Sequence, residues 1–445
     1  MSVCAAFGLP VSRMPSPYGT SELQGIAFAR FDRSSMPFAS MPLDSLRCMP
    51  EPIYRALAAS LLAAGILAAA NGPAQAQGPD APFFTDTAAR SAYVLDVETG
   101  SILLEKNGDQ GFAPASLAKL MTADIALDAL AKGAIEPQTT YPVSDHAWRT
   151  GGAPSRTATM FASVRSNVPV DALLKGLAIQ GANDAAIILA EGLEGSERAF
   201  AEHMNRRATE LGLTASHFVN ATGLPAEGQA VSARDMALLG RHIVSAYPEQ
   251  AVLYAEPEFE WNRILQRNRN PLLRLGIGAT GLATGFTDGE GYSIVGVIGK
   301  DGRQTVLSLF GFESDAARTK ETVRLFDWTN ANFERRTIFA SGQAVGQAQV
   351  FGGTAGQVSA VVDGKVELYI PRKRTDLVAA TVRYDGPLQA PLRKGDRIGT
   401  LNVTIEGKPA LQRDVFVGED VSEGTFAARA AGAIQELAFG WIRSL

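Results

Sequence analysis

The chain has 445 residues and a formal net charge of −5, and 46% of its residues are hydrophobic while 20% are charged. This length exceeds what one ordinary core needs and predicts two domains with additional segments. The mild negative charge argues against a nucleic-acid-binding protein. With four histidines, two cysteines and no CxxC or HExxH motif, the sequence predicts neither a metal site nor another cofactor.

An apolar segment in the first part of the chain is typical of a secretory signal peptide. Arg55 gives it a positive start, residues 56–70 are apolar, and Ala74-Gln75-Ala76 has the pattern of a cleavage site. The apolar run is shorter than a membrane span requires, and the alternative is a buried Ala-rich helix. We therefore expect residues 49–76 to be a signal peptide that is cleaved after Ala76.

Residues 1–48 precede this segment and are rich in Ser, Pro and Met without a steady periodicity. Since Met49 would open a signal peptide of ordinary length, we hypothesise that translation starts there and that residues 1–48 are a non-native or disordered upstream extension. Both cysteines, Cys4 and Cys48, lie in this stretch, so the mature chain would need no disulfide. N-terminal sequencing of the unprocessed precursor tests this hypothesis, and a peptide from residues 1–48 would contradict it.

The next part of the chain alternates between strand and helix patterns. Residues 89–110 predict a β-hairpin, and a helix is expected from about Ser116 to Ala131. Residues 168–193 predict two helical stretches that are broken at Gly181-Ala182-Asn183. Two amphipathic helices follow, in residues 196–213 and 232–248.

Residues 291–312 predict two buried strands joined by a turn at Lys300-Asp301-Gly302, and residues 315–333 predict a closing helix. Strands at both ends with helices between them indicate one α/β unit whose two ends share a sheet. We expect this domain to span residues 77–336.

The character of the sequence changes after residue 336. Short β-type runs alternate with Gly turns over residues 337–420, which predicts a small all-β domain. Residues 421–445 predict an amphipathic helix with apolar side chains at spacings of three or four, including Phe426 and Trp441. This helix would lie on a membrane surface or dock on the β-domain. Liposome flotation of the full chain against a 1–420 truncation distinguishes the two.

Residues 112–123, FAPASLAKLMTA, place a hydroxyl and an amine three positions apart where an apolar run begins. Positions i and i+3 share a helix face, so Ser116 and Lys119 can touch. The positive potential of a helix N-terminus and loss of water would lower the pKa of Lys119, which makes a neutral general base. The alternative is a helix cap, Ser116, beside a solvated Lys119, because the SxxK pattern alone is common.

Further segments resemble those of one enzyme family. LLKGLAIQGANDAAIILAE, HFVNATGLP and ATGLATGFTDGEGYSIV follow PASLAKLMTA in the order and at separations typical of the low-molecular-mass penicillin-binding proteins. These are D-alanyl-D-alanine carboxypeptidases of the serine SxxK acyltransferase superfamily, and the resemblance covers nearly the whole mature chain. It implies a serine β-lactamase/DD-peptidase-like transpeptidase domain of α/β (α+β) class, followed by a small all-β domain and a C-terminal amphipathic helix.

The resemblance also implies roles for particular residues. Ser116 would attack the penultimate D-Ala carbonyl of a peptidoglycan stem peptide, and Lys119 would accept its proton. Asn183 would hold the substrate amide and the Lys119 side chain. The backbone N–H groups of Ser116 and of Phe286, or a neighbour, would form the oxyanion hole. Substrate binding would fall to Thr284 with Gly285 and Arg318, which would take the terminal carboxylate.

Two positions depart from the family pattern. The SxN motif is Gly181-Ala182-Asn183 here and lacks its serine, while the KTG motif is Ala283-Thr284-Gly285 and lacks its lysine. The first departure removes a proton shuttle, which is typically worth about 10² to 10⁴ in rate, although Gly181 leaves space for a water. The second removes a cation near the substrate carboxylate; Arg318 would remain there, and Arg149 or Arg156 is a candidate replacement.

Three functions therefore remain open from the sequence. The first is a working carboxypeptidase, and the second is an impaired relative that binds peptidoglycan or penicillin without turnover. The third, a β-lactamase, lacks an assignable deacylating group. The expected partners are peptidoglycan stem peptides, β-lactam antibiotics and, through residues 421–445, the inner-membrane surface, but not nucleic acid. The expected location is the periplasm.

Overall fold

The computed structural model describes residues 84–426. The predicted upstream extension, the predicted signal peptide and residues 427–445 of the predicted terminal helix lie outside this range and stay predictions. Between residues 84 and 426, no helix combines the length and the apolar character needed to cross a membrane.

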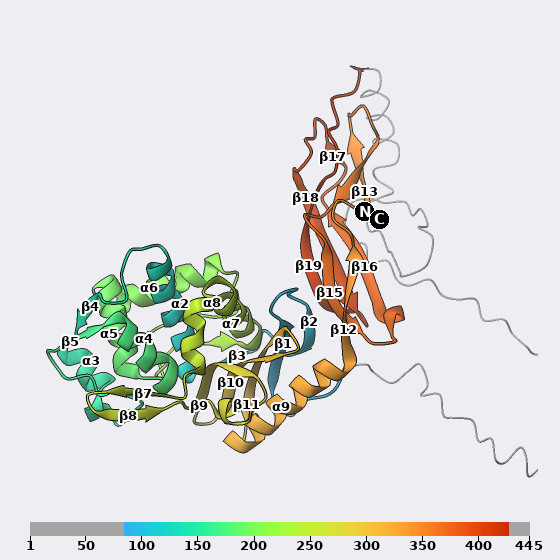
Figure 1. Cartoon of the computed structure of the whole chain (residues 1–445). Coiled ribbons are helices and arrows are strands. Elements are labelled where there is room, and N and C mark those ends of the chain that lie inside the picture. The colour runs from blue at the N-terminus through green and yellow to red at the C-terminus, as the bar shows by residue number, and fades with distance from the viewer. Residues whose placement is uncertain (1–83, 427–445) are drawn as a thin grey trace, which may run out of the picture. The chain divides into compact units, whose positions relative to one another are not determined.

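A five-stranded antiparallel sheet joins the two ends of the first domain. Its strand order is β2-β1-β11-β10-β9. The bounds are β1 Ser91–Asp96, β2 Ile102–Lys106, β9 Ala279–Thr287, β10 Gly291–Lys300 and β11 Arg303–Phe312. Strand β1 pairs with β11, more than two hundred residues later in the chain, so the expected sharing of one sheet is confirmed (Figure 1). Both predicted hairpins, β1–β2 and β10–β11, are present.

Helices between β2 and β9 fill the rest of this domain. Their bounds are α2 Lys119–Ala131, α3 Asp145–Thr150, α4 Val170–Lys175, α5 Asn183–Glu194, α6 Glu197–Glu210, α7 Ala233–Ala246 and α8 Pro248–Ala251, and α9 Asp315–Asn332 follows β11. The predicted break between two helical stretches is present, because a π-helical turn, η4 Gly176–Gln180, ends at Gly181 and α5 begins at Asn183. The short strands in this part are β3 Gly111–Phe112, β4 Thr140–Pro142, β5 Asn167–Pro169, β6 Val231–Ser232, β7 Glu258–Trp261 and β8 Ile264–Arg267.

Serine side chains set the starts of three of the longer helices. Ser196, Ser232 and Ser314 each accept a hydrogen bond from the backbone N–H three residues further on, at the starts of α6, α7 and α9. Such caps satisfy a donor that the helix itself leaves free. The predicted amphipathic helices therefore begin where the sequence supplies an acceptor.

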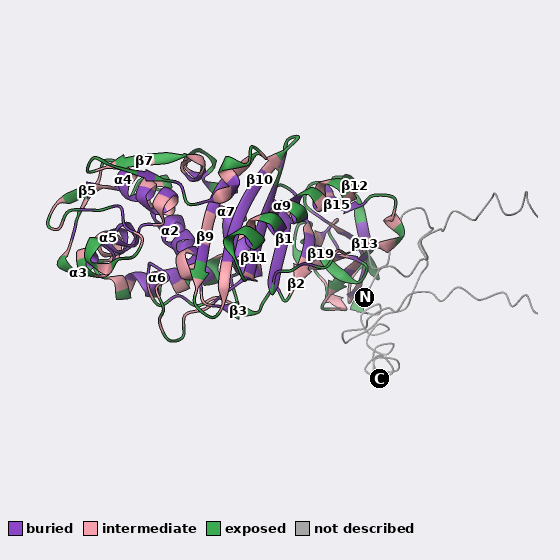
Figure 2. Cartoon of the chain, turned by 90° about the horizontal axis from the view of Figure 1, so that it is seen from below, coloured by how far each residue is buried: buried purple, intermediate pink, exposed green. Residues whose placement is uncertain are grey.

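Both faces of the sheet are buried. Val295, Val297 and Val306 belong to the core that includes residues of α2, α5 and α7. The alternate positions Ile294 and Leu309 are also fully buried, although they lie on the other face. Helix α9 packs against β10 and β11 and covers that face, and the burial shows as purple strands in Figure 2. The sheet is thus a rigid support for β9, its edge strand.

The C-terminal part is all-β, as expected. Its bounds are β12 Phe333–Phe339, β13 Ala344–Phe351, β14 Gln357–Val361, β15 Val366–Pro371, β16 Val378–Tyr384, β17 Leu388–Gln389, β18 Arg397–Ile405 and β19 Lys408–Val417. Strand β12 pairs with β15, and the other six form one sheet in the order β16-β18-β19-β14-β13-β17. Strand β12 begins at Phe333, before the expected boundary at residue 337, because α9 runs directly into it without a linker.

The terminal helix was expected to begin at residue 421, and this start is wrong. Val421 forms a β-bridge with Leu392, and Glu423 forms one with Gly353. The backbone of residues 421–424 is therefore extended, because bridges to the β-domain satisfy its polar groups.

Candidate active site

The segment of Ser116 and Lys119 differs from the predicted helix start. Ser116 lies in a 3-10 turn, η2 Ala115–Ala118, and the α-helix itself begins at Lys119. Ala115, directly before Ser116, has a positive φ of 47°, which is uncommon for a residue with a side chain. Because side chains three apart nearly eclipse in a 3-10 turn, Ser116 and Lys119 still share one side.

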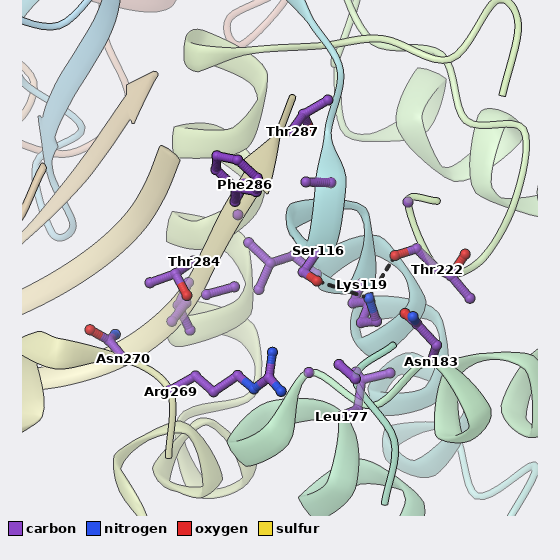
Figure 3. Close-up of a pocket in the computed structure, with 18 of the residues that line it drawn as sticks. Ser116, Lys119, Leu177, Asn183, Thr222, Arg269, Asn270, Thr284, Phe286 and Thr287 are labelled. Carbon is purple, nitrogen blue, oxygen red and sulfur yellow. Dashed lines mark hydrogen bonds between the residues drawn. The ribbon is translucent and has the colours of Figure 1, made fainter. Parts of the chain in front are cut away.

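The serine and the lysine are in direct contact. Lys119 Nζ donates a hydrogen bond to Ser116 Oγ at 3.1 Å and another to the backbone carbonyl of Thr222 at 2.7 Å (Figure 3). Lys119 is only 3% exposed. The alternative of a solvated lysine beside a capping serine is therefore wrong.

Burial changes the protonation of this amine. Loss of water lowers the pKa of Lys119 from 10.5 to about 7, and the positive charge of Arg269 acts in the same direction, while Asp184 opposes it. Near neutral pH, a large fraction of the amine is then unprotonated. A neutral amine in contact with a serine hydroxyl has the arrangement of a general base beside a nucleophile.

Asn183 lies at the first position of α5, on the wall of the same cavity. Its Nδ2 donates to Thr157 Oγ1 at 2.8 Å, and its Oδ1 is buried without a partner in the described part of the chain. The expected hold of Asn183 on the Lys119 side chain is thus not formed in this structure, since the hydrogen bonds of the amine go to Ser116 and Thr222. The free Oδ1 is an acceptor placed for a donor that the protein itself does not supply.

Strand β9 forms the cavity wall next to the segment that carries Ser116. Gly285 has no room for a side chain, because an added Cβ would lie 2.6 Å from Ser293 Oγ and 3.2 Å from Ala115 Cβ. Because Gly285 has no side chain, β9 can lie close to the residues before Ser116. Glu290 Oε2 also accepts the backbone N–H of Ala113 at 2.6 Å, which ties that segment to the turn after β9.

A cavity of about 800 Å³ contains the whole predicted site. The residues that line it include every predicted or altered position, Ser116, Lys119, Gly181, Asn183, Ala283, Thr284, Gly285 and Arg318, and also Phe286. The cavity thus brings together segments that are up to two hundred residues apart in the sequence.

The cations of the cavity were predicted only in part. Arg318 is 2% exposed and donates to the Ser293 carbonyl and to Asp315, so it is a buried residue of the cavity wall. Burial lowers the pKa of Arg318. Neither Arg149 nor Arg156, which were considered as replacements for the missing lysine, is among the residues that line the cavity.

Arg269 also lines the cavity and was missed in the sequence. Its Nε donates to Gln180 Oε1 at 3.2 Å, and its guanidinium points into the space between Thr284 and Lys119 (Figure 3). Burial lowers the pKa of Arg269 as well. No signal in QRNRNP distinguishes Arg269 from its basic neighbours, so only the fold identifies it.

The histidines lie outside the cavity. His146, His203 and His242 contact Glu197, Glu194 and Asp124, and none of the four histidines lines the cavity. Among residues 84–426, no group of three or more His, Cys, Asp or Glu side chains is arranged to hold a metal ion.

Comparison with known proteins finds one enzyme family over most of the chain, in agreement with the motifs and the fold. Residues 75–313 match the family model of D-alanyl-D-alanine carboxypeptidase, and residues 333–423 match the C-terminal domain of penicillin-binding protein 5. D-alanyl-D-alanine carboxypeptidase DacA of Escherichia coli is 33% identical over 79% of this chain and 88% of its own length. DacC of the same organism is 35% identical over 77% of this chain and 86% of its own.

Solved structures agree. Penicillin-binding protein 5 from Haemophilus influenzae superposes with a TM-score of 0.66 at 31% identity, over 76% of this chain and 99% of that one. Penicillin-binding protein 6B from Escherichia coli gives a TM-score of 0.59 at 29% identity, and the match covers 76% of this chain and 97% of that one. The resemblance and the fold class of the first domain and of the all-β domain are thereby confirmed, while the C-terminal amphipathic helix stays a prediction. The chain belongs to the D-alanyl-D-alanine carboxypeptidase family of serine-type, low-molecular-mass penicillin-binding proteins.

Proposed function

We propose that Ser116 is the acylated nucleophile of this carboxypeptidase and that Lys119 is its general base. The observation that carries the proposal is the 3.1 Å contact between Lys119 Nζ and Ser116 Oγ, made by an amine that is 3% exposed. A base must lie within hydrogen-bond reach of the proton that it takes and have a pKa near the working pH, and Lys119 meets both conditions.

The reaction then runs through an ester. Ser116 Oγ attacks the carbonyl carbon of the penultimate D-Ala of a stem pentapeptide while Lys119 takes the hydroxyl proton. The tetrahedral intermediate collapses by breaking the peptide bond, and the leaving D-Ala amine receives that proton. Water, deprotonated by Lys119, hydrolyses the ester, and the proton returns to Ser116. The products are free D-Ala and a stem peptide one residue shorter.

Backbone and side-chain donors would stabilise the charges of this reaction. The N–H groups of Ser116 and Phe286 would form the oxyanion hole, where each donor is worth about 10² to 10³ in rate. Thr284, with Gly285 and Arg318, would take the terminal carboxylate of the substrate. Asn183 Oδ1, buried without a partner, supports the proposal that it accepts the N–H of the substrate amide.

Two positions that depart from the family pattern, Gly181 and Ala283, affect proton transfer to the leaving amine and binding of the substrate's terminal carboxylate. An added Cβ at Gly181 would meet only Ser116 Oγ, at 3.9 Å, so space for a water remains beside the nucleophile. We propose that this water relays the proton to the leaving amine, in place of the family's serine. Arg269, whose guanidinium points into the space between Thr284 and Lys119, supplies positive charge that Ala283 lacks. These substitutes support a working enzyme.

A second candidate function is that of a binding module. The loss of the SxN serine and the KTG lysine favours it, because both would slow turnover without preventing acylation of Ser116. A β-lactamase remains the third, and rapid nitrocefin hydrolysis would support it. Turnover of a peptide ending in D-Ala-D-Ala separates the first function from the other two.

We further propose that β-lactams acylate Ser116, by analogy with the relative from Haemophilus influenzae that is called penicillin-binding protein 5. The signal peptide expected at residues 49–76 and the peptidoglycan substrate place the mature chain in the periplasm in this proposal. Residues 421–445 are proposed to contact the inner membrane from residue 425 onward, since residues 421–424 pair with the β-domain.

Fluorescent penicillin tests the assignment of the nucleophile. The wild-type chain should carry a covalent label that denaturation does not remove, while Ser116→Ala should carry none. Incubation with a pentapeptide ending in D-Ala-D-Ala should then release D-Ala over many turnovers. A label without release would support the binding module, and label on Ser116→Ala would refute the assignment.

A further inference from the structure

The base of the dyad has a partner that is not a side chain. Lys119 Nζ donates to the Thr222 carbonyl at 2.7 Å, a shorter contact than the 3.1 Å to Ser116 Oγ. A neutral amine has two N–H donors and one lone pair. Once an N–H is bound to the carbonyl, the directions left to the lone pair are restricted, so the position of this carbonyl helps to decide whether the lone pair faces Ser116.

The position of the carbonyl depends in turn on Asn220. Its Oδ1 accepts three hydrogen bonds, from Gly223 N at 2.7 Å, Thr222 Oγ1 at 2.9 Å and Thr222 N at 3.2 Å. Its Nδ2 donates to the Leu224 carbonyl at 2.9 Å, and Thr222 Oγ1 accepts the Leu224 N–H at 3.1 Å. One asparagine side chain therefore closes the turn of residues 220–224, as Asn commonly does for its own backbone.

The same turn also contacts the segment of the nucleophile. Gly223 has a φ of +79°, and an added Cβ would lie 1.7 Å from the Ala115 carbonyl oxygen. Ala115 is the residue before Ser116 and has the positive φ of 47° described above. The turn thus packs against the backbone that presents the nucleophile, with no room for any larger residue at position 223.

Further bonds fix the turn to the helices of the domain. Thr122 Oγ1, on the helix of Lys119, donates to the Ala221 carbonyl at 2.7 Å, and Glu197 Oε1 accepts the Ala221 N–H at 3.2 Å. Ala221 and Thr222 are 0% and 2% exposed. The turn is therefore buried, satisfied in its hydrogen bonds and attached to the element that carries the base.

We propose that Asn220 is a positioning residue of the serine–lysine dyad, because the turn that it closes holds the Lys119 amine against Ser116. Asn220 contacts neither reacting atom and acts through the Thr222 carbonyl and through Gly223. The inference rests on the proposed acylation of Ser116. It assigns a task to HFVNATGLP, a segment that carried part of the family resemblance but no residue role.

The test is the kinetics of penicillin acylation, with the rate constant of acylation separated from the noncovalent dissociation constant. Asn220→Ala removes four hydrogen bonds of the turn, and we expect it to slow acylation 10- to 100-fold, since small misplacements of reacting groups cost rates of this order. The noncovalent constant should change less than twofold, because the substrate-binding wall on β9 is untouched. Asn220→Asp keeps the acceptor that an Asx turn needs, and it should recover most of the rate.

The matched control is Asn205→Ala. Asn205 is half-buried like Asn220, and its side chain bonds to Phe218 N at 2.9 Å, Phe218 O at 2.8 Å and Ala201 O at 3.0 Å. It thus supports the same loop but touches neither Thr222 nor Ala115. We expect Asn205→Ala to lose thermal stability while acylating at the wild-type rate.

A further variant keeps the test decisive if Asn220→Ala does not fold. Thr222→Val preserves shape but removes the hydroxyl that bonds to Asn220 Oδ1 and Leu224 N, and it should slow acylation three- to tenfold. The inference is overturned if folded Asn220→Ala, or Thr222→Val in its place, acylates at the wild-type rate. It is also overturned if Asn205→Ala slows acylation as much as Asn220→Ala does. An unlabelled wild type would overturn the proposed function and this inference together, whereas a labelled wild type with unaffected variants overturns the inference alone.

Discussion

Replacing Lys119 by methionine should abolish acylation and yet make the protein more stable. The amine is buried, and loss of water lowers its pKa from 10.5 to about 7. In the unfolded chain the lysine keeps its ordinary pKa, so folding at neutral pH requires partial loss of a proton that the unfolded state binds firmly. A methionine has a similar shape and no charge to desolvate.

The size of the effect follows from proton linkage. With a pKa of 10.5 unfolded and about 7 folded, the lysine destabilises the folded state by about 4 kcal/mol at pH 7 and by about 1 kcal/mol at pH 9.5. The penalty is complete below the folded pKa and disappears as the pH rises toward the unfolded pKa. Loss of the hydrogen bond to the Thr222 carbonyl offsets about 1 kcal/mol.

Thermal unfolding of Lys119→Met and wild type at pH 6.5 and pH 9.5 measures this difference. At pH 6.5 the net gain is about 3 kcal/mol, and the variant should melt about 6–12 °C higher, since about 1 kcal/mol corresponds to about 2–4 °C in a domain of this size. At pH 9.5 the difference should nearly vanish. A variant that is less stable than wild type at pH 6.5, or a difference that does not change with pH, would refute the description of Lys119 as a buried neutral base.

Three other substitutions test the altered site. Gly181→Ser restores a hydroxyl near Ser116 Oγ and should raise kcat for peptide hydrolysis about tenfold or more. This gain is expected in spite of backbone strain, because residue 181 has a φ of +64°. An unchanged kcat would mean that proton relay does not limit the rate. Ala283→Lys should lower KM about tenfold for a peptide with a free terminal carboxylate but not for its amide, and equal effects on both would exclude a carboxylate contact. Gly285→Ala should slow penicillin acylation about 100-fold, because its Cβ would lie 2.6 Å from Ser293 Oγ; a wild-type rate would show that β9 can move away without consequence.

Local patterns predicted much of the fold and the intact part of the site. The hairpins β1–β2 and β10–β11 follow from alternation and turn residues, and the helix break at Gly181 follows from an apolar run that is interrupted by a glycine in the left-handed region. The contact between Ser116 and Lys119 was predicted because an i, i+3 contact is a local property, but their roles came only from the resemblance of the further segments to one enzyme family. The 3-10 turn at Ser116 was not predicted, since the packing of β9 against the segment before it decides that geometry.

The remaining features depend on contacts between distant segments. Arg269 enters the cavity because its strand-to-turn segment passes beside η4, where Arg269 N donates to the Ile179 carbonyl at 3.2 Å. The Thr222 carbonyl is a backbone group, and its direction cannot be read from residue types. The wrong start of the predicted terminal helix has the same cause, because Leu392 pairs with Val421 within the β-domain.

Mass spectrometry of the penicillin-treated protein, followed by a D-Ala release assay on the same preparation, tests the central claim most directly. We predict one covalent adduct, on the peptide that contains Ser116, and repeated release of D-Ala from a D-Ala-D-Ala pentapeptide, both absent in Ser116→Ala. An intact, folded wild-type chain without an adduct, or an adduct on another residue, would contradict the assignment of Ser116 and Lys119 as nucleophile and base.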